Sequence, residues 1–220
     1  KSTADAVSKY EYIPRNKIKI IYNGIRDLEA IKQSRAALLK ELGLPEKYRY
    51  IGTISRLEPI KNQAMMIKAF HQSKKEIPEL KLILIGDGAS KNDLVTLVKS
   101  LNIEEDVIFT GFLNNPQKFI QLFELFLLSS FSEGTSMTLL EAMSLGVACV
   151  VTDVGGNPEI VDKTTGHIVA SNNDSLFAKA MLDLLDDPVK RKKYAESGRN
   201  KYLNHFTVSK MINSYEKLYK

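Results

Sequence analysis

The stretch LFLLSSFSEGTSMTLLEAMSLGVACVVT, residues 125–152, carries the alternation that decides the fold. Residues 125–129 and 148–152 are short apolar runs typical of buried strands, and residues 137–145 between them have the apolar period of a helix. A strand, a helix and a strand in this order predict two parallel strands joined by a right-handed crossover. Both strands are apolar throughout, which indicates a sheet covered by helices on both faces.

The same alternation extends over most of the chain. Further strands are predicted at 17–22, 50–55, 81–86, 107–110 and 167–169, and further helices at 28–42, 61–76, 90–101, 117–123, 158–162, 175–186, 189–206 and 208–218. The fold class is therefore α/β, a doubly wound, Rossmann-like parallel sheet with helices on both faces. Such sheets bind ligands in the loops that follow their strands.

Two helix ends carry specific signals. Gly43 stands where a left-handed residue usually ends a helix. Asp174 is expected to cap the helix predicted at 175–186, which would bury a single apolar stripe. That stripe consists of Leu176, Phe177, Ala180, Met181, Leu184 and Leu185.

The composition is that of a globular protein. The chain has 220 residues, of which 44% are hydrophobic and 26% are charged. Its longest apolar runs, 82–85 and 125–128, are far below the ~20 residues of a membrane span, and residues 1–10 lack the apolar core of a signal peptide. A single cysteine, Cys149, excludes an internal disulfide framework. We expect a cytoplasmic protein in which Cys149 is an inert core residue.

Positive charge is concentrated in the N-terminal third. Residues 1–75 hold 16 Lys/Arg against 7 Asp/Glu, a net charge of +9, whereas the whole chain carries +5. This asymmetry favours an anionic ligand or a phospholipid surface, and a solvated basic surface explains it equally well. Aromatic residues are not interleaved with the cations, and helix-turn-helix and zinc spacings are absent, so we expect no nucleic-acid partner.

The loop after the predicted strand 50–55, loop one (residues 56–61), carries Arg56 and Lys61 just before a helix. Arg offers a planar fork and Lys a mobile point charge, and both suit a phosphate. The alternative interpretation is that Arg56 and Lys61 are ordinary surface cations.

Loops two and three are rich in glycine. Loop two (residues 86–88) reads Gly86-Asp87-Gly88 after a predicted strand, and the glycines would let the backbone approach a ligand closely. It lacks the third glycine of a dinucleotide fingerprint, so an ordinary tight turn is the alternative. In loop three (residues 111–113), Gly111 is followed by Phe112 and Leu113. These two side chains could flank a flat base or pack in the core.

Loop four (residues 130–136) leads into the helix predicted at 137–145, and the informative stretch is residues 132–141 (SEGTSMTLLE). The N–H groups and positive dipole end of that helix suit a diphosphate, and Thr135 and Ser136 could add hydroxyl donors. Glu133 lies in the loop and Glu141 in the helix among apolar neighbours. A carboxylate in such surroundings needs a partner, either ribose hydroxyls or a cation of the protein. Loop five (residues 153–159) again has a glycine pair before a helix, with Pro158 in its first turn.

In this order and spacing the loops resemble a known family. Over residues 12–220 the chain looks like the C-terminal, donor-binding domain of a GT-B-fold retaining glycosyltransferase of the large glycosyltransferase group 1. The resemblance rests on 21–25 (IYNGI), Arg56 with Lys61, 86–88 (GDG), 109–111 (FTG), Glu133-x₇-Glu141 and 155–159 (GGNPE). The double-glutamate segment is the most specific of these. One departure is 133–136, which reads EGTS where many members read EGFG, and this leaves the donor sugar open.

The resemblance implies roles for the matching residues. Arg56, Lys61 and Glu133 would be the catalytic set, the two cations neutralising the leaving nucleoside diphosphate and Glu133 lying against the donor sugar. Glu141 would hold the ribose hydroxyls. The other donor-binding residues would be Gly86, Asp87, Gly88, Gly111, Phe112, Leu113, Gly134, Thr135, Ser136 and Met137.

The resemblance also implies the chemistry. A sugar would pass from a nucleotide-diphospho-sugar to an acceptor with retention of anomeric configuration, in glycan or polysaccharide synthesis. A UDP-sugar is favoured and a GDP-sugar stays open. The family needs no metal or other cofactor, and the sequence has no Asp-x-Asp or His/carboxylate cluster.

The resemblance further implies that a domain is missing. Residues 1–15 would be the tail of an N-terminal domain with its linker, 16–205 the nucleotide-sugar-binding domain, and 206–220 a helix crossing back. The glycan or lipid-linked acceptor would bind the missing domain, so the chain is expected to be inactive alone. The basic N-terminal part could touch the cytoplasmic face of a membrane. A non-catalytic sugar-nucleotide-binding module and a GT-B-like sugar-nucleotide epimerase are the alternatives.

Overall fold

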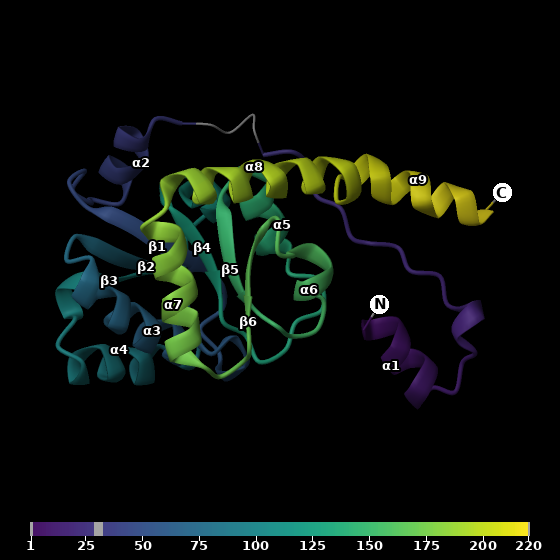
Figure 1. Ribbon diagram of the computed structural model, residues 1–220, viewed down its shortest axis with the longest axis horizontal. Coiled ribbons are helices and arrows are strands. Elements are labelled where there is room, and N and C mark those ends of the chain that lie inside the picture. The colour runs from purple at the N-terminus through teal and green to yellow at the C-terminus, as the bar shows by residue number, and fades with distance from the viewer. Residues whose placement is uncertain (1, 29–32, 220) are drawn as a thin grey trace.

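A single parallel sheet organises the domain. The computed structural model describes residues 2–28 and 33–219, and within these residues six strands form one sheet in the order β3-β2-β1-β4-β5-β6 (Figure 1). The strands are β1 Arg49–Ile54, β2 Leu80–Ile85, β3 Val107–Gly111, β4 Leu125–Leu128, β5 Ala148–Thr152 and β6 Gly166–Val169. The predicted doubly wound α/β fold is confirmed.

Helices connect the strands and flank them. The α-helices are α1 Ser2–Tyr10, α2 Arg35–Glu41, α3 Gln63–Glu76, α4 Lys91–Ser100, α5 Met137–Ser144, α6 Asn157–Ile160, α7 Asp174–Leu185, α8 Pro188–His205 and α9 Val208–Tyr219. Short 3-10 helices are η1 Arg15–Lys17, η3 Pro59–Lys61, η4 Glu104–Asp106 and η5 Pro116–Leu122. Helix α2 ends as predicted at Gly43, which has φ +66°.

The strand order creates one point where the chain reverses direction across the sheet. From β1 the chain moves outward to β2 and β3, then returns to place β4 on the other side of β1. β1 and β4 share a single register pair, Gly52 with Phe126, whereas β1 and β2 are paired over their whole length. The loops after β1 and β4 therefore lie on either side of a topological switch point, where doubly wound sheets bind their ligands.

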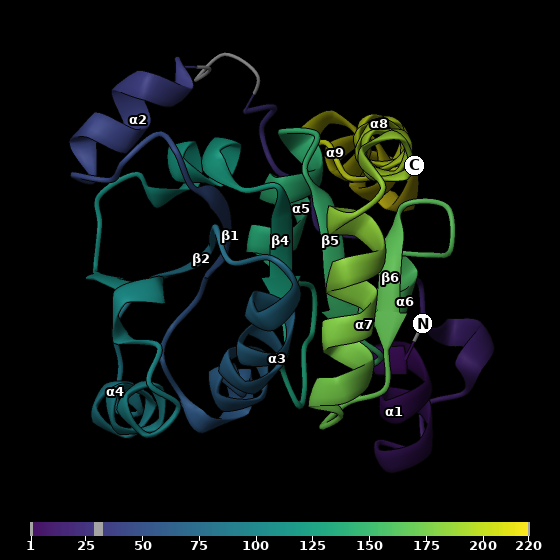
Figure 2. The same ribbon diagram turned by 60° about the vertical axis from the view of Figure 1, so that its left-hand side comes forward.

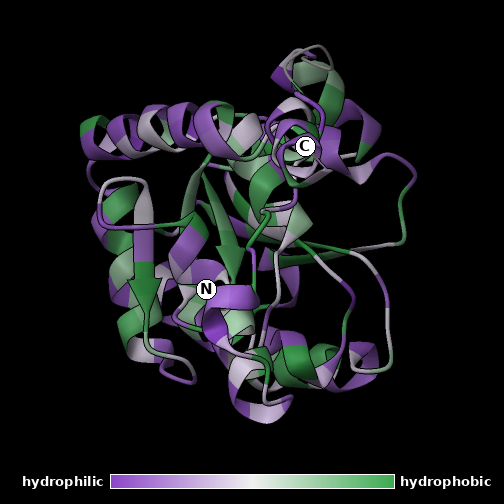
Figure 3. Ribbon diagram, turned by 90° about the vertical axis from the view of Figure 1, so that its right-hand side faces the viewer, coloured by the Kyte–Doolittle hydropathy of each residue, from purple (hydrophilic) through white to green (hydrophobic). Residues whose placement is uncertain are grey.

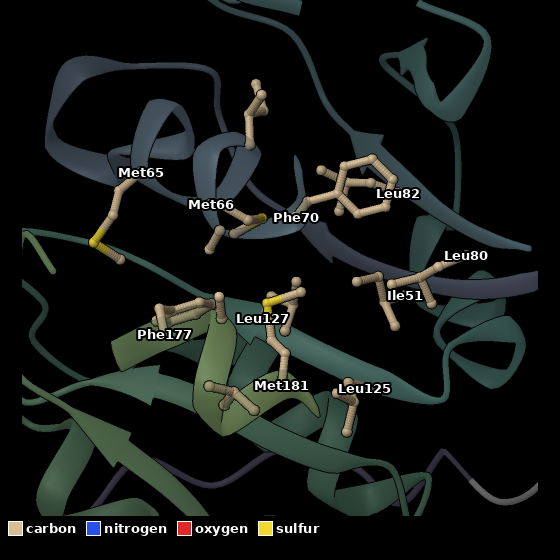
Figure 4. Packing of buried hydrophobic residues seen from close by; sticks show 14 of the residues in the cluster. Ile51, Met65, Met66, Phe70, Leu80, Leu82, Leu125, Leu127, Phe177 and Met181 are labelled. Carbon is tan, nitrogen blue, oxygen red and sulfur yellow. The ribbon is translucent and has the colours of Figure 1, made fainter. Parts of the chain in front are cut away.

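Each face of the sheet has its own hydrophobic core. Along β2, Leu82 and Leu84 belong to the core beneath α3, α4 and α7, whereas Ile83 and Ile85 belong to the opposite core. Figure 4 shows the first core, where Met66 and Phe70 of α3 and Met181 of α7 close over the strands. Burial of the apolar side chains of both cores is the main contribution to the stability of the domain.

The second core lies beneath α2, η5, α5 and α8 (Figure 2). It contains the predicted inert cysteine, Cys149, which is fully buried and whose thiol pKa is raised by burial to about 12. Hydrophilic and hydrophobic segments alternate along the helices in Figure 3, as expected for helices that present one face to a sheet.

Residues 17–22 do not form the predicted strand. After η1 the segment is extended but pairs with no strand in the described structure. Its alternating pattern has another cause, because Ile18 and Ile20 are partly buried and line a cavity together with Ile160 of α6, while Lys17 and Lys19 are exposed. An alternating segment can thus pack against the end of a sheet rather than join its edge.

Three helix predictions also need correction. The cap of α7 is Asn173, whose side chain accepts from the Leu176 amide at 2.9 Å, and the neighbouring Asp174 instead accepts from Gln72. Leu176 is 47% exposed, so it does not belong to the buried stripe. The segment 117–123 is a 3-10 helix that begins at Pro116, and of the helix predicted at 28–42 only α2 is seen, with 29–32 outside the described residues.

Candidate functional site

Loops one and four form the walls of the switch point. The Phe131 amide donates to the Ile60 carbonyl at 2.8 Å, and the Ser129 hydroxyl donates to the Lys61 carbonyl at 2.9 Å. Both contacts join the segment that follows β1 to the segment that follows β4. The two loops are therefore held in fixed register by hydrogen bonds that do not depend on the charged side chains.

Lys61 and Glu133 meet across this junction. The Lys61 ammonium lies 2.7 Å from a carboxylate oxygen of Glu133, and the Ser130 hydroxyl donates to the same oxygen at 2.6 Å. The two side chains are 20% and 8% exposed. A largely buried carboxylate requires such partners, and Ser130 is a partner that sequence analysis missed. The structure thus brings two of the three predicted catalytic residues into contact.

The third predicted catalytic residue, Arg56, lies at the surface. Its side chain is 72% exposed, and its guanidinium donates to the carboxylate of Glu58 at 2.7 Å. Sequence analysis also missed Glu58. The available signal was its position, because a carboxylate only two residues from Arg56 lies within reach of the guanidinium.

Helix α5 begins where loop four ends. Ser136 is its N-cap, and the side chain of Ser136 accepts from the Leu139 amide at 3.3 Å. Ser136 is only 5% exposed, so its hydroxyl serves the helix rather than acting as a free donor. Thr135 is partly buried, and Gly134 and Met137 are exposed at the same helix end. The first-turn amides of α5, which no helical carbonyl reaches, point out of this end.

Glu141 lies one turn further along α5. Its side chain is partly buried, and no residue in the described parts of the chain donates a hydrogen bond to it or forms an ion pair with it. Burial therefore raises the pKa of Glu141 to about 7. Of the two partners predicted for this carboxylate, a cation from the described residues is ruled out.

Loops two and three support loop one from the side. A Cβ on Gly86 would lie 2.1 Å from the Ser55 carbonyl oxygen, and a Cβ on Gly88 would lie 2.4 Å from that of Leu57. These glycines therefore allow the backbone of loop two to lie close to the backbone of residues 55–57. Asp87 is exposed, and the Gly88 amide and Lys91 hold the pKa of its carboxyl below the ordinary value.

The two side chains of loop three have different surroundings. Leu113 is partly buried and packs on the second core, as in the core-packing interpretation. Phe112 is 80% exposed, so its ring is available to a flat ligand. Gly111 has φ +69°, in the left-handed region, and its carbonyl accepts from the Gly86 amide, which ties loop three to loop two.

Loop five lies directly under loop four. A Cβ on Gly155 would lie 1.7 Å from the Glu133 carbonyl oxygen, and a Cβ on Gly156 would lie 2.1 Å from that of Gly134. The Gly156 amide donates to the Glu133 carbonyl at 3.2 Å. The glycine pair is thus required for the position of Glu133 and not only for a helix start.

A cavity of about 300 Å³ adjoins loop four, between Gly134 and Thr135 on one side and residues 18–23 on the other. At its edge the Tyr22 hydroxyl donates to the Glu159 carboxylate at 2.7 Å. Burial and this carboxylate raise the pKa of Tyr22 to about 12. Elsewhere, the described residues contain no cluster of three or more potential metal ligands and no helix long and apolar enough to cross a membrane.

Comparison with known proteins identifies the family. The model of the family described as glycosyl transferases group 1 matches residues 34–201, which span the sheet, loops one to five and most of α8. The chain belongs to this family. The resemblance drawn from the loop motifs is confirmed.

Two curated relatives are glycosyltransferases or related synthases. N-acetyl-alpha-D-glucosaminyl L-malate synthase from Bacillus anthracis is 31% identical over 207 residues, covering 94% of this chain and 54% of the relative. A Campylobacter jejuni enzyme is 34% identical over 199 residues, covering 90% and 52%. Its name is N-acetylgalactosamine-N,N'-diacetylbacillosaminyl-diphospho-undecaprenol 4-alpha-N-acetylgalactosaminyltransferase. The chain thus spans about half the length of the curated relatives it matches.

A solved structure supports the fold. Anabaena Alr3699/HepE in complex with UDP matches with a TM-score of 0.90 and 23% identity, over 98% of this chain and 60% of that chain. At this identity the likeness shows the fold alone. It confirms the expectation that the sheet is one Rossmann-like half of a GT-B fold.

Proposed function

We propose that this chain is the donor-binding domain of a retaining glycosyltransferase and that it binds a nucleoside-diphospho-sugar at the switch point between β1 and β4. The observation that carries the proposal is Glu141, a partly buried carboxylate with no partner among the described residues. Vicinal ribose hydroxyls would supply the two donors that such a carboxylate requires. The family match favours glycosyl transfer over an epimerase.

The diphosphate lies, in this proposal, between loop one and the start of α5. The first-turn amides beyond Ser136 and the helix dipole favour an anion at that place. Lys61 is already fixed beside it, and Arg56 is exposed on the same loop. As the bond to the sugar breaks, negative charge grows on the leaving diphosphate, and these preorganised groups stabilise it. Glu133, next to Lys61, would face the sugar.

The base would stack on the exposed ring of Phe112, with Gly111 and Leu113 beside it and loop two below. A UDP-sugar is favoured, since the Anabaena protein that shares the fold has been solved with UDP and with UDP-glucose. A GDP-sugar stays open. The transfer would retain anomeric configuration, with the departing phosphate as base, and would need no metal ion or other cofactor.

The acceptor would bind a further domain. The segment around Ile25 runs beside Thr207, where the Ile25 amide donates to the Phe206 carbonyl and the Val208 amide donates to the Ile25 carbonyl. The N-terminal linker and α9 thus leave the domain side by side. Helix α9 extends beyond the sheet (Figure 1), and it has no buried residue. We place residues 1–15 and 206–220 at the junction with that domain, which would hold a glycan or lipid-linked acceptor.

The proposal extends to the membrane surface. Tyr10, Tyr12 and Ile13 are exposed beside Lys9 and Arg15 in the basic N-terminal part. Aromatic and basic side chains together favour the interface of an anionic membrane. A cytoplasmic enzyme would reach a lipid-linked acceptor in this way. Co-sedimentation with vesicles should increase with their anionic lipid content and fall with salt.

Calorimetric titration of the 220-residue chain with UDP, GDP and ADP tests the proposed function. One diphosphate is expected to bind, and the preferred base would narrow the range of donors. Failure of all three to bind at millimolar concentration would contradict the proposal.

A further inference from the structure

Both cations proposed for the diphosphate are already engaged by carboxylates of the protein. Lys61 is paired with Glu133 and Arg56 with Glu58, each at 2.7 Å. The two pairs differ in their surroundings. Glu133 is 8% exposed and also accepts from Ser130, whereas Glu58 is 32% exposed and has Arg56 as its ion-pair partner. A diphosphate would therefore compete with a fixed carboxylate at Lys61 and with a more exposed one at Arg56.

The backbone of loop one builds the Arg56–Glu58 pair. Between them, Leu57 is fully buried, and its amide and carbonyl are held by the Asp87 carbonyl and the Ser90 amide, both at 2.9 Å. The Glu58 amide also donates to the Arg56 carbonyl at 3.0 Å, so the backbone makes a tight turn at Leu57 and brings Arg56 and Glu58 together. The Glu58 carbonyl also accepts from the Lys61 amide at 2.9 Å, which fixes Glu58 at the start of η3.

We infer that Glu58 is a positioning residue that competes with the donor diphosphate for the Arg56 guanidinium and so weakens diphosphate binding. This inference rests on the proposed function. Arg56 must exchange its carboxylate partner for phosphate oxygens before it can contribute to binding. Glu58 then returns to solvent, which its exposure allows. The competition tunes affinity, so that the nucleoside diphosphate product is released more readily than Arg56 and Lys61 alone would permit.

The size of the effect on UDP binding depends on the exposure of the Arg56–Glu58 pair. Exposed ion pairs are weak because water and salt screen them, and they change an equilibrium by about two- to fivefold. Replacing Glu58 with glutamine removes its charge and keeps its shape. The Glu58→Gln variant should therefore bind UDP about two- to fivefold more tightly than the original protein at low ionic strength.

A double-variant cycle separates this competition from simple repulsion between Glu58 and phosphate. The UDP dissociation constant is measured by calorimetry for the original chain, Glu58→Gln, Arg56→Ala and the double variant. The gain from Glu58→Gln is expected in the original background and is expected to vanish when Arg56 is alanine. Glu79→Gln is the matched control, since it removes the same charge from a residue that precedes β2, at the opposite end of the parallel strands from loop one.

Four results would overturn the inference. UDP binding by the original chain with no gain in Glu58→Gln would overturn the competition and leave the proposed function intact. An equal gain in both backgrounds, or the same gain in Glu79→Gln, would show that charge alone acts and would also overturn it. No UDP binding by the original chain would overturn the proposed function together with this inference.

Discussion

The Lys61 ammonium lies 2.7 Å from the Glu133 carboxylate, and this ion pair joins the loop after β1 to the loop after β4 across 72 residues of sequence. It stands at the switch point of the sheet, where β1 and β4 share one register pair. Because Glu133 is largely buried, the pair is both a structural contact and part of the proposed donor site. Stability and binding should therefore respond differently when its two members are changed separately or together.

Removing Lys61 alone should lower both the stability of the domain and its affinity for UDP. Lys61→Met leaves Glu133 buried with only Ser130 as a partner, and we expect a loss of about 1–3 kcal/mol in the free energy of unfolding. UDP binding should weaken about 10- to 100-fold through loss of a charge-assisted contact. The double variant Lys61→Met/Glu133→Gln should regain most of the stability and none of the binding. Urea denaturation and calorimetry measure the two effects, and a double variant as unstable as Lys61→Met would contradict this reading.

Glu141 should lower the stability of the domain at neutral and alkaline pH. Burial raises its pKa from 4.5 to about 7, so the folded state binds the proton more tightly than the unfolded state does. Its favourable contribution is complete below about pH 4.5 and is lost as the pH rises through about 7. Glu141→Gln should then be more stable than the original protein by about 1–3 kcal/mol at pH 8.

This difference should disappear towards pH 4.5, where the original Glu141 is protonated. Denaturation curves at pH 5 and pH 8 check the expectation, with the exposed Glu76→Gln as control. A stability difference that does not change with pH would mean that Glu141 has a partner in solution. The same variant should weaken UDP binding, which is the trade-off expected of a functional carboxylate.

Gly155 should not tolerate a side chain. Its φ is +52°, and a Cβ would lie 1.7 Å from the Glu133 carbonyl oxygen. Gly155→Ala should lower the free energy of unfolding by about 2–4 kcal/mol, through backbone strain and displacement of loop four. Gly198→Ala in α8 is the control, because its Cβ would have only ordinary contacts at 3.7 Å or more. That substitution should be neutral or stabilise by about 0.5–1 kcal/mol, and an equal loss in both would contradict the close packing of loops four and five.

Nucleotide binding should not depend on a divalent metal. Arg56, Lys61 and the amides at the start of α5 supply the positive potential that a metal would otherwise provide. The UDP dissociation constant should be the same after dialysis against EDTA and after addition of magnesium or manganese. Binding that appears only with added metal would show that these groups are insufficient.

Much of the fold could be predicted because the apolar strands of a parallel sheet and the amphipathic helices around them have distinct periods. Residues 125–152 show this clearly, since β4, α5 and β5 all lie where the pattern indicated them. The error at residues 17–22 has a physical cause. Alternating Lys and Ile indicate one buried and one exposed face, and they do not specify whether the buried face meets a neighbouring strand or lines a cavity beside α6.

The positions of the site residues followed from the fold, but their partners did not. The resemblance places Lys61 and Glu133 in one site, and the sheet brings them together because loops one and four follow the neighbouring strands β1 and β4. That Ser130 joins them, and that Glu58 holds Arg56, depends on side-chain directions in irregular loops. The glycines of loop two suggest room for a ligand, and the structure shows that they make room for the carbonyl groups of Ser55 and Leu57.

The most direct test of the proposed donor site is whether Glu141 contacts the ribose. The dissociation constants of UDP and of 2′,3′-dideoxy-UDP would be measured for the original chain and for Glu141→Ala. We predict that loss of both hydroxyls weakens binding to the original chain by about tenfold or more, as expected for hydrogen bonds to a carboxylate, and has no effect in Glu141→Ala. The same ratio in both proteins would mean that Glu141 does not hold the ribose, and the donor site would have to lie elsewhere.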